Sequence, residues 1–410
     1  MNKLWVIKEE RKDLRDAIVR DLKVSPVLAQ LLVNRDLLDP STVHQFLYGT
    51  KSSLHDPFLL KNMQKAVDRI RGAITRGEKI LVYGDYDADG VSSVALLLTY
   101  LRRESAQVDW YLPHRVNEGY GLNSEAVEEI RARGVTLVIT VDCGVTDAVE
   151  VALLNSHHID TIVVDHHEIQ KDSLPAAYAI VNPLQEGCTY PFKELAGVGL
   201  AYKLACALAG DRAHDNEEFL DLVAVGTVAD VVSQTGENRI LTRLGLQRLS
   251  KAPRVGLQAL MEVAGLGERE VLAEHIGFVI GPRINVAGRI GSPELALRLL
   301  LSEKKEEALE IAAKLHSENG LRQKMQEKIF KEAVAKIDGQ MNFKDTSVIV
   351  VWDEGWHPGV IGIVASKLVG RYYRPAIVFS LQEGRAKGSG RSIDNFNLLE
   401  AVSSLSLIHI

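Results

Sequence analysis

Acidic and imidazole side chains follow three short apolar runs of the sequence. The run KILVYG leads into Asp85, Asp87 and Asp89, TLVITV leads into Asp142, and TIVV leads into Asp165, His166 and His167. Runs of this composition predict β-strands. In an open α/β sheet the carboxyl ends of the parallel strands open into the binding crevice. We therefore expect these side chains to converge at one edge of a sheet.

The residue types at these strand ends predict a metal centre. Five carboxylates in one crevice repel one another and raise each other's pKa unless cations neutralise them. Oxygen ligands with an imidazole suit Mn²⁺ or Mg²⁺ better than Zn²⁺, which prefers thiolates and several histidines. Two such ions about 4 Å apart, bridged by one carboxylate, generate a hydroxide and hold a phosphoryl oxygen. The pattern therefore predicts hydrolysis of a phosphate ester or anhydride.

Each motif also has an alternative interpretation. DYDADG alone is compatible with a calcium loop or a turn, since Asp and Gly favour turns. The pair His157 and His158 shows that adjacent histidines occur here without an acidic context. The combination at three successive strand ends is what favours metal-dependent hydrolysis.

The elements around these motifs predict an α/β fold with a doubly wound, mostly parallel sheet. KILVYG, QVDWYLP, TLVITVD, TIVVD and YAIVN are strand-like, with helical stretches between most of them. Helical spacing precedes this pattern and resumes from about 196 to 300. A helix of some ten turns is expected from about Glu303 to Ile337, interrupted only by Gly320. TSVIVVW, IGIVASKLV and PAIVFSL then indicate a second, smaller α/β unit.

Four regions follow from this pattern. We predict an N-terminal helical region at 1–75, a catalytic α/β domain at 76–302, a connecting helix at 303–337 and a second α/β domain at 338–410.

Composition narrows the class of protein. Charged residues make up 25% and hydrophobic residues 46% of the chain, the ordinary values of a soluble globular protein. Three cysteines without CxxC spacing disfavour a zinc ribbon and a secreted disulfide framework. The charged start of the chain disfavours a signal peptide, and no apolar run is long enough to span a membrane. We expect a cytoplasmic protein without membrane contact.

Charge is unevenly distributed along the chain. The formal net charge of −6 argues against a uniformly basic nucleic-acid binder. Between Arg283 and Arg391, however, 18 Lys and Arg stand against 13 Asp and Glu, a local balance of +5. Most of these charges fit a solvated helix face.

Four motifs resemble the signatures of the DHH phosphoesterases: GDYDADG, VDCG, VDHHE and GTVADVV. Further segments are similar to the bacterial single-strand-specific DNA exonucleases of that superfamily: RDLLDPSTVHQFLYG, LPHRVNEGYGLN, GPRINVAGRIGSPELAL, GWHPGVIGIVASKL and GSGRSIDNFNL. The similarity covers nearly the whole chain, to about residue 401.

The resemblance implies two metal sites that share Asp142. Asp87 and Asp142 would hold the first ion, and the second would be held by Asp89, Asp142, His166 and Asp230. Tyr83 stands where many members have a histidine, so we expect Asp85 or water to complete the first site. His167 would face the phosphate, and Asp165 would orient the imidazoles.

The resemblance also implies a phosphate-binding set. Its members are Arg115, Arg283, Asn285, Arg289, His357, Ser389 and Arg391. Arginine forks bind phosphate oxygens bidentately, and neighbouring glycines let backbone N–H groups approach. Any one of these arginines taken alone is more often a surface salt-bridge partner than a phosphate ligand, but the set favours phosphate.

The activity implied is a single-stranded-DNA-specific 5′ to 3′ exonuclease that releases 5′-mononucleotides in DNA repair and recombination. Implied partners are single-stranded DNA, a single-strand-binding protein and a RecQ-type helicase. The alternatives are a small-substrate phosphohydrolase (a manganese pyrophosphatase, or a nano-RNA or cyclic-dinucleotide phosphodiesterase) and a non-catalytic replication scaffold. The intact acidic and imidazole set weighs against the scaffold.

The C-terminal end departs from the family pattern. Family members continue into a glycine-histidine stretch and commonly into an OB fold that grips single strands, whereas this sequence ends in SSLSLIHI. We expect the second domain to be incomplete at this end, and strand binding to be weaker for it.

Overall fold

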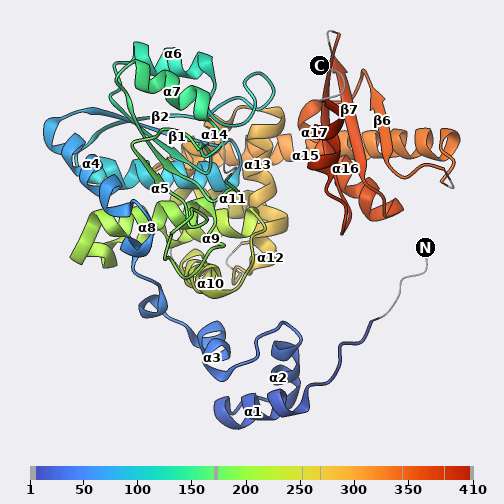
Figure 1. Cartoon of the computed structure of the whole chain (residues 1–410), viewed down its shortest axis with the longest axis horizontal. Helices are drawn as coiled ribbons and strands as arrows, with labels where there is room; N and C mark the ends of the chain where they lie inside the picture. The colour runs from blue at the N-terminus through green and yellow to red at the C-terminus, as the bar shows by residue number, and fades with distance from the viewer. Residues whose placement is uncertain are drawn as a thin grey trace.

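Three helices at the start of the chain form a small unit with its own core (Figure 1). The computed structural model describes residues 6–169, 174–251, 253–267, 269–343, 345–382 and 384–406. The three helices are α1 (Lys12–Leu22), α2 (Pro26–Val33) and α3 (Pro40–Tyr48). Ser25 and Asp39 cap α2 and α3, each followed by proline at the first helical position, which fixes where these helices begin.

A buried ion pair attaches the next segment to the main body. The segment contains η1 (Lys51–Ser53), η2 (Pro57–Leu59) and α4 (Met63–Arg76). Glu237 accepts hydrogen bonds from the ammonium of Lys203 at 2.6 Å and from the backbone N–H of His55 at 2.8 Å. Because both charged side chains are buried, each depends on the other for neutralisation.

The main body is built on a five-stranded parallel sheet of order β2-β1-β3-β4-β5. The strands are β1 (Lys79–Gly84), β2 (Gln107–Tyr111), β3 (Leu137–Val141), β4 (Asp160–Val164) and β5 (Ala179–Val181). The register pairs Tyr83 with Tyr111 and with Thr140, so the strands end nearly level. The predicted doubly wound parallel sheet is confirmed.

Helices cover both faces of this sheet. α4, α5 (Ala88–Arg103), α8 (Gly197–Ala209) and α9 (Leu220–Ala229) pack on the face that carries Ile80 and Val82. α6 (Ser124–Ala132) and α7 (Ala148–Ser156) pack on the opposite face, against Leu81 and Tyr83. The alternation along β1 therefore places Tyr83 on the side of α6 and α7.

A helical layer follows the sheet. It contains η3 (Gly210–Phe219), α10 (Gly236–Lys251), α11 (Val255–Val263), α12 (Ala273–His275), the π-helical turn η4 (Ile276–Ile280), α13 (Gly281–Ile290) and α14 (Pro293–Leu301). α13 lies directly on the GDYDADG loop, because a Cβ at Gly288 would lie only 2.5 Å from the carbonyl oxygen of Tyr86.

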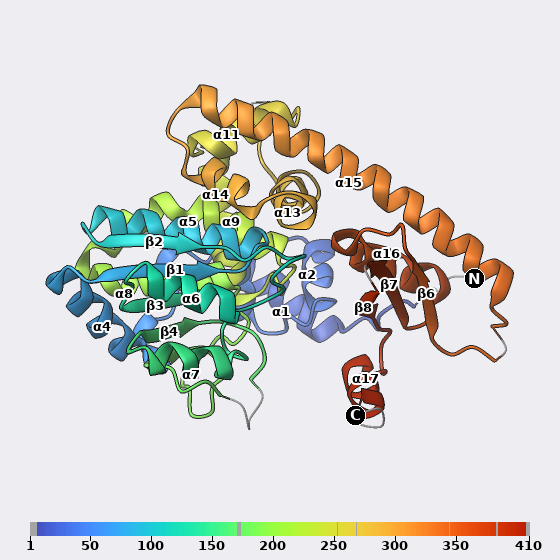
Figure 2. The ribbon, with the colours of Figure 1, turned by 90° about the horizontal axis from the view of Figure 1, so that it is seen from above.

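The long helix α15 (Lys305–Gln340) joins the main body to the smaller unit (Figure 2). Its 36 residues span about 54 Å. Leu315 and the apolar residues before it belong to the core of the main body, whereas Ile329 and those after it belong to the core of the smaller unit. Gly320 does not interrupt the helix.

The smaller unit has a mixed three-stranded sheet of order β6-β7-β8. Its elements are β6 (Ile349–Asp353), α16 (Pro358–Tyr372), β7 (Ala376–Gln382), β8 (Arg385–Arg391) and α17 (Leu398–Ser406). IGIVASKLV lies in α16. β8 pairs antiparallel with β7, and its sequence RAKGSGR gave no strand signal. The expected α/β character of this unit is confirmed. Residues 407–410, within the C-terminal SSLSLIHI, lie outside the described residues.

The two α/β units touch through α13 and β8. A Cβ at Gly359 of α16 would lie 2.0 Å from the carbonyl oxygen of Arg289. Lys387 of β8 donates to the carbonyl oxygens of Arg115 and Val116 at 3.0 and 3.2 Å. None of the helices in the described part of the chain is both long and apolar enough to cross a bilayer.

Two glycine substitutions separate close packing from helix propensity. Gly288→Ala should destabilise the fold by about 1 to 3 kcal/mol, because its methyl group would clash with the backbone carbonyl of Tyr86, which cannot move without shifting the loop. Gly320→Ala should stabilise it by about 1 kcal/mol, since nothing lies within 4 Å of the added methyl group and alanine favours the helix. Urea denaturation of both variants measures these changes; a neutral Gly288→Ala would contradict the packing.

Candidate active site

The strand ends bring the predicted acidic and imidazole side chains together. Their ligand atoms form three groups, each within 4.8 Å: Asp85, Asp87 and Asp142; Asp89, His166 and Asp230; and Asp142, His166 and His167. Asp230 comes from the end of α9 rather than from a strand. The convergence expected from the sequence is therefore observed, and two of the three groups share Asp142.

Asp87 and Asp89 are fixed by backbone N–H groups at helix starts. The carboxylate of Asp87 caps α5, accepting from the N–H groups of Asp89 and Gly90 at 2.8 and 3.1 Å. Both oxygens of Asp89 accept from the start of α8, from Gly197 and Val198, each at 2.8 Å. Helix N-termini favour negative charge, so both carboxylates are held in place before any ion binds.

Asp142 occupies a tight position after β3. Its φ of 60° lies in the left-handed region, which non-glycine residues seldom adopt. A Cβ at Gly197 would lie 2.7 Å from the Asp142 Cβ, so only glycine fits there. The Tyr120 hydroxyl donates to the Asp142 carbonyl oxygen at 3.1 Å. Strained backbone of this kind is common at functional sites.

His166 presents a buried nitrogen to two carboxylates. Its Nε2 lies 3.1 Å from Asp142 Oδ1 and 3.6 Å from Asp230 Oδ2. Among the described residues neither this atom nor the buried Oδ1 of Asp85 has a hydrogen-bond partner. A buried polar atom without a partner is costly. Oxygen ligands with one imidazole fit Mn²⁺ or Mg²⁺, and the residues present therefore fit such ions.

Asp165 holds the turn after β4. Its Oδ1 accepts from the backbone N–H groups of His166 and His167 at 2.8 and 3.2 Å and lies 2.7 Å from His167 Nδ1, while its Oδ2 accepts from Val145. His167 Nδ1 also lies 3.1 Å from the Tyr120 hydroxyl. Asp165 thus orients the imidazole of His167 but contacts only the backbone of His166.

Burial and mutual repulsion shape the electrostatics. Burial, then the charge of Asp87, raises the pKa of Asp85 and brings that of Asp89 to about 7. Burial and the neighbouring carboxylates raise the pKa of Asp142, and burial with the charge of Asp89 brings that of Asp230 to about 7.

The imidazoles respond differently. Burial lowers the pKa of His166. Burial also acts to lower the pKa of His167, but the hydrogen bond and charge of Asp165 outweigh it and raise that pKa to about 9. Burial acts to raise the pKa of Asp165, and the hydrogen bonds from His167 and Val145 bring it below the ordinary value. His167 and Asp165 therefore form an ion pair near neutral pH.

Tyr83 points away from this cluster. Its hydroxyl donates to the Gly121 carbonyl at 2.7 Å, and its ring stacks on Tyr111 with centroids 5.2 Å apart. Asp85 instead groups with Asp87 and Asp142, as expected for the completion of the first site.

Three of the predicted arginines gather where the two α/β units meet. The Arg115 guanidinium lies 5.1 Å from the centre of the Tyr86 ring. Burial, then the charge of Arg115, lowers the pKa of Arg289 to about 10 and also lowers that of Arg391. Guanidinium groups that lower one another's pKa in this way are typical of a site that binds an anion.

The remaining members of the phosphate set have structural contacts of their own. His357 caps α16 through Nδ1, which accepts from the Gly359 N–H at 3.1 Å. Ser389 accepts from Arg391 at 3.4 Å. The Asn285 side-chain oxygen accepts from the Ala88 N–H at 2.8 Å, tying α13 to α5. Arg283 donates to the Val279 carbonyl and pairs with His316 of α15, apart from the other arginines.

Sequence reasoning missed Tyr120 and Lys387. Tyr120 lies between two glycines with positive φ, Gly119 and Gly121, which allow its ring to turn onto His167 at a centroid distance of 5.6 Å. The flanking glycines were the only available signal. Lys387 gave none, because its contact with the Arg115 loop exists only when the two units are together.

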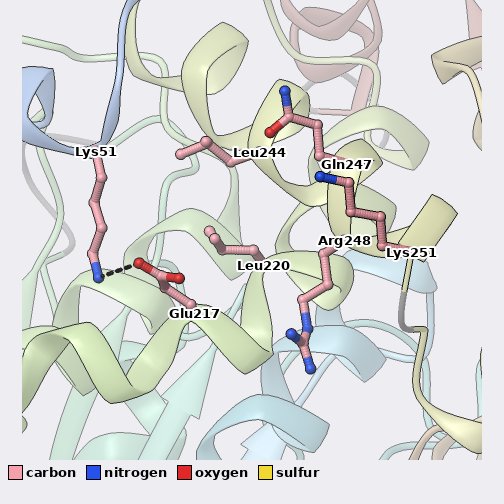
Figure 3. A pocket seen from close by; sticks show the side chains of 7 residues that line it. All are labelled: Lys51, Glu217, Leu220, Leu244, Gln247, Arg248 and Lys251. Carbon is pink, nitrogen blue, oxygen red and sulfur yellow. Dashed lines mark hydrogen bonds and ion pairs between the residues drawn. The ribbon is translucent and has the colours of Figure 1, made fainter.

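A separate pocket of about 360 Å³ lies away from this cluster (Figure 3). It is lined by Lys51, Glu217, Leu220, Leu244, Gln247, Arg248 and Lys251. The ammonium of Lys51 pairs with Glu217 at 3.2 Å across it. None of the predicted site residues lines this pocket.

Comparison with known proteins places the chain in a family. Residues 79–227 match the DHH family, N-terminal domain, and residues 345–409 match the DHHA1 domain. The single-stranded-DNA-specific exonuclease RecJ of Escherichia coli (strain K12) is 35% identical over 420 residues, covering 98% of this chain and 72% of that protein. The chain belongs to the RecJ family.

Other members agree in sequence and structure. RecJ of Bacillus subtilis (strain 168) is 46% identical over 97% of this chain, which spans 50% of that protein's length. RecJ from Thermus thermophilus, solved in complex with Mn²⁺, matches with a TM-score of 0.81 and 31% identity, covering 98% of this chain and 56% of that one. An exonuclease RecJ bound to manganese matches with a TM-score of 0.73 and 36% identity, covering 84% of this chain and 85% of that one. The RecJ fold therefore extends over both α/β units.

The raised carboxylate pKa values predict pH-dependent metal affinity. Asp89 and Asp230 hold protons up to a pH of about 7, and a proton must leave each before its oxygen binds an ion. Mn²⁺ affinity should therefore fall tenfold or more per unit as pH drops below about 7. Titration calorimetry at pH 6, 7 and 8 measures this. Equal affinity at pH 6 and 8 would contradict the assignment.

Proposed function

We propose that this chain hydrolyses single-stranded DNA as a metal-dependent exonuclease, working 5′ to 3′ and releasing 5′-mononucleotides. The observation that carries the proposal is the convergence of the acidic and imidazole ligand groups around Asp142 at the carboxyl edge of the sheet. Membership of the RecJ family supplies the substrate and the polarity. The chain spans about half the length of the Bacillus subtilis relative. The activity of that whole protein is therefore part of the proposal for this chain.

Two Mn²⁺ or Mg²⁺ ions would be held by the cluster. Asp85, Asp87 and Asp142 would hold one ion, and Asp89, His166 and Asp230 the other. Asp142 would complete the second site as well, since its Oδ1 lies 3.1 Å from His166 Nε2. When bound, such ions polarise a phosphoryl oxygen and lower the pKa of water so that it attacks at neutral pH. Fixed carboxylates reduce the reorganisation needed when the ions enter.

His167 would stabilise negative charge on the reacting phosphate. Its Nδ1 is engaged by Asp165, which leaves Nε2 to donate a hydrogen bond. With a pKa of about 9, the ring carries its proton at neutral pH. A charged donor fixed before reaction is worth more than one that must turn into place.

The arginine group would bind the phosphates. Arg115 and Arg289 come from the main body, whereas Ser389 and Arg391 come from the smaller unit. A substrate held by both units must reach across the contact between them, which suits a strand better than a small phosphate ester. This division weighs against the small-substrate phosphohydrolase.

By the same family inference, the protein would act in DNA repair and recombination in the cytoplasm. Its partners would be a single-strand-binding protein and a RecQ-type helicase.

One assay separates the candidate substrates. A labelled single-stranded oligonucleotide, its duplex and pyrophosphate are each incubated with the protein and Mn²⁺, Mg²⁺ or a chelator. We expect mononucleotides from the single strand in the presence of either metal, and none with the chelator. Release of phosphate from pyrophosphate with an intact single strand would favour the small-substrate hydrolase instead.

Asp142→Ala should abolish hydrolysis and leave the fold intact, because both proposed metal sites lose the carboxylate that they would share. Single-turnover cleavage of the labelled strand measures the loss, and Asp109→Ala on the surface of β2 is the matched control. More than about a tenth of the original rate would contradict the shared ligand, since 1.36 kcal/mol of lost stabilisation already gives tenfold.

Arg391→Ala should raise the apparent KM more than it lowers kcat, because Arg391 binds phosphate without touching the reacting bond. The affinity for single strands should also depend less on salt, since fewer counterions are released. Arg385→Ala, an exposed arginine of the same strand, is the control. An unchanged salt slope would contradict a phosphate contact at Arg391.

A further inference from the structure

The middle of α15 is polar on the side that faces the protein. Leu315 belongs to the core of the main body and Ile329 to that of the smaller unit. Of the residues described between them, the buried ones are two amides, Asn319 and Gln326. With Arg322 they form a stripe at spacings of three and four residues, which places them on one face of the helix.

The two amides hold one guanidinium. Arg322 donates to the side-chain oxygen of Asn319 at 2.6 Å and to that of Gln326 at 2.7 Å. Burying an amide is costly unless it is hydrogen-bonded. The helix thus orders two buried polar groups around one cation, and neither group neutralises its charge. No carboxylate of the described residues lies within ion-pair distance of Arg322.

Arg322 lies near the arginine group of the proposed active site. The end of α13 packs against this part of α15: a Cβ at Gly291 would lie 2.8 Å from a side-chain oxygen of Glu318, and Ile290 packs into the same core as Met325. Arg289 is the residue just before this contact. The charges of Arg115 and Arg322 both act to lower the pKa of Arg289.

Several arginines from separate elements therefore lie close enough to act on one another's charge. Burial lowers the pKa of Arg322 as well as those of Arg289 and Arg391. Like charges brought together and desolvated destabilise the fold unless an anion binds between them. A phosphodiester fits, since its oxygens accept from planar guanidinium forks.

We propose that Arg322, held by Asn319 and Gln326, binds a backbone phosphate of the DNA strand, so that α15 is part of the nucleic-acid site as well as the connector. The inference rests on the proposed function and names a subsite within it. Arg289 and Arg322 approach from two neighbouring helices, and Arg391 approaches from the smaller unit. The strand then crosses α15 beside Arg322, where the buried side chains of the helix are amides.

The test compares two charge removals on one helix. Arg322→Gln removes the charge and keeps an amide that can donate to its neighbours. Lys324→Gln removes the same charge from an exposed position two residues away. Binding of a 3′-labelled single strand of about twenty nucleotides is followed by fluorescence anisotropy in a chelator, at low and high salt across the range where counterion release is measurable. The chelator prevents cleavage during the measurement.

We expect Kd to rise about tenfold for Arg322→Gln, with the salt slope smaller by about 0.7, the value for one phosphate contact on a single strand. Lys324→Gln should change neither quantity appreciably. Arg322→Lys, which keeps the charge but loses the fork, should recover the salt slope and only part of the affinity. The thermal shift produced by Mn²⁺ should be the same in all variants, since Arg322 is not a metal ligand.

Equal Kd values and slopes for Arg322→Gln and Lys324→Gln would overturn the proposal. So would weaker binding of Arg322→Gln with an unchanged salt slope and a lower melting temperature, which is the result of a structural role alone. Both outcomes leave the proposed function standing. Failure of the unsubstituted protein to bind the strand at all would instead overturn the proposed function.

Discussion

Mutual repulsion among carboxylates at one edge of the sheet is the constraint on which the rest of the structure depends. Parallel strands that end level place Asp85, Asp142 and Asp165 in one crevice, and the chain must hold them there against this repulsion. It does so with dipoles and hydrogen bonds: helix starts hold Asp87 and Asp89, and His167 pairs with Asp165. The negative charge that these contacts do not neutralise gives the site its affinity for divalent ions.

The same balance recurs with opposite sign at the contact between the two units. There the crowded groups are arginines, and the protein offers them amides and aromatic faces instead of carboxylates. An acidic cluster suited to cations and an arginine group suited to anions thus lie next to each other. Helix α13 joins them: Asn285 accepts a hydrogen bond from the GDYDADG loop, and Arg289 belongs to the arginine group. A phosphate with its metal ions is complementary to this pairing.

Local signals decided what could be predicted. The sheet was predicted from short apolar runs that alternate with helical stretches. Its acidic edge was predicted from the rule that the carboxyl ends of parallel strands lie on one side of the sheet. β8 was missed because RAKGSGR contains no β-branched or aromatic residue, and its pairing comes from β7. Arg322 was missed because nothing in KLHSENGLRQKMQ says that this part of the helix lies between two cores. Asn285 and His357 were predicted to meet phosphate. The contact of Asn285 with Ala88 depends on packing between distant elements, whereas His357 caps its own helix through Gly359.

The helix-capping roles of Asp87 and Asp89 change how related sequences are interpreted. A relative that no longer cleaves DNA would still use both aspartates to hold the starts of α5 and α8. Finding the two aspartates in a sequence is therefore evidence for the fold as much as for catalysis. His166 differs, because its Nε2 has no hydrogen-bond partner among the described residues and caps no helix. Among homologues that have lost the activity, we therefore expect this histidine to be substituted before either aspartate is.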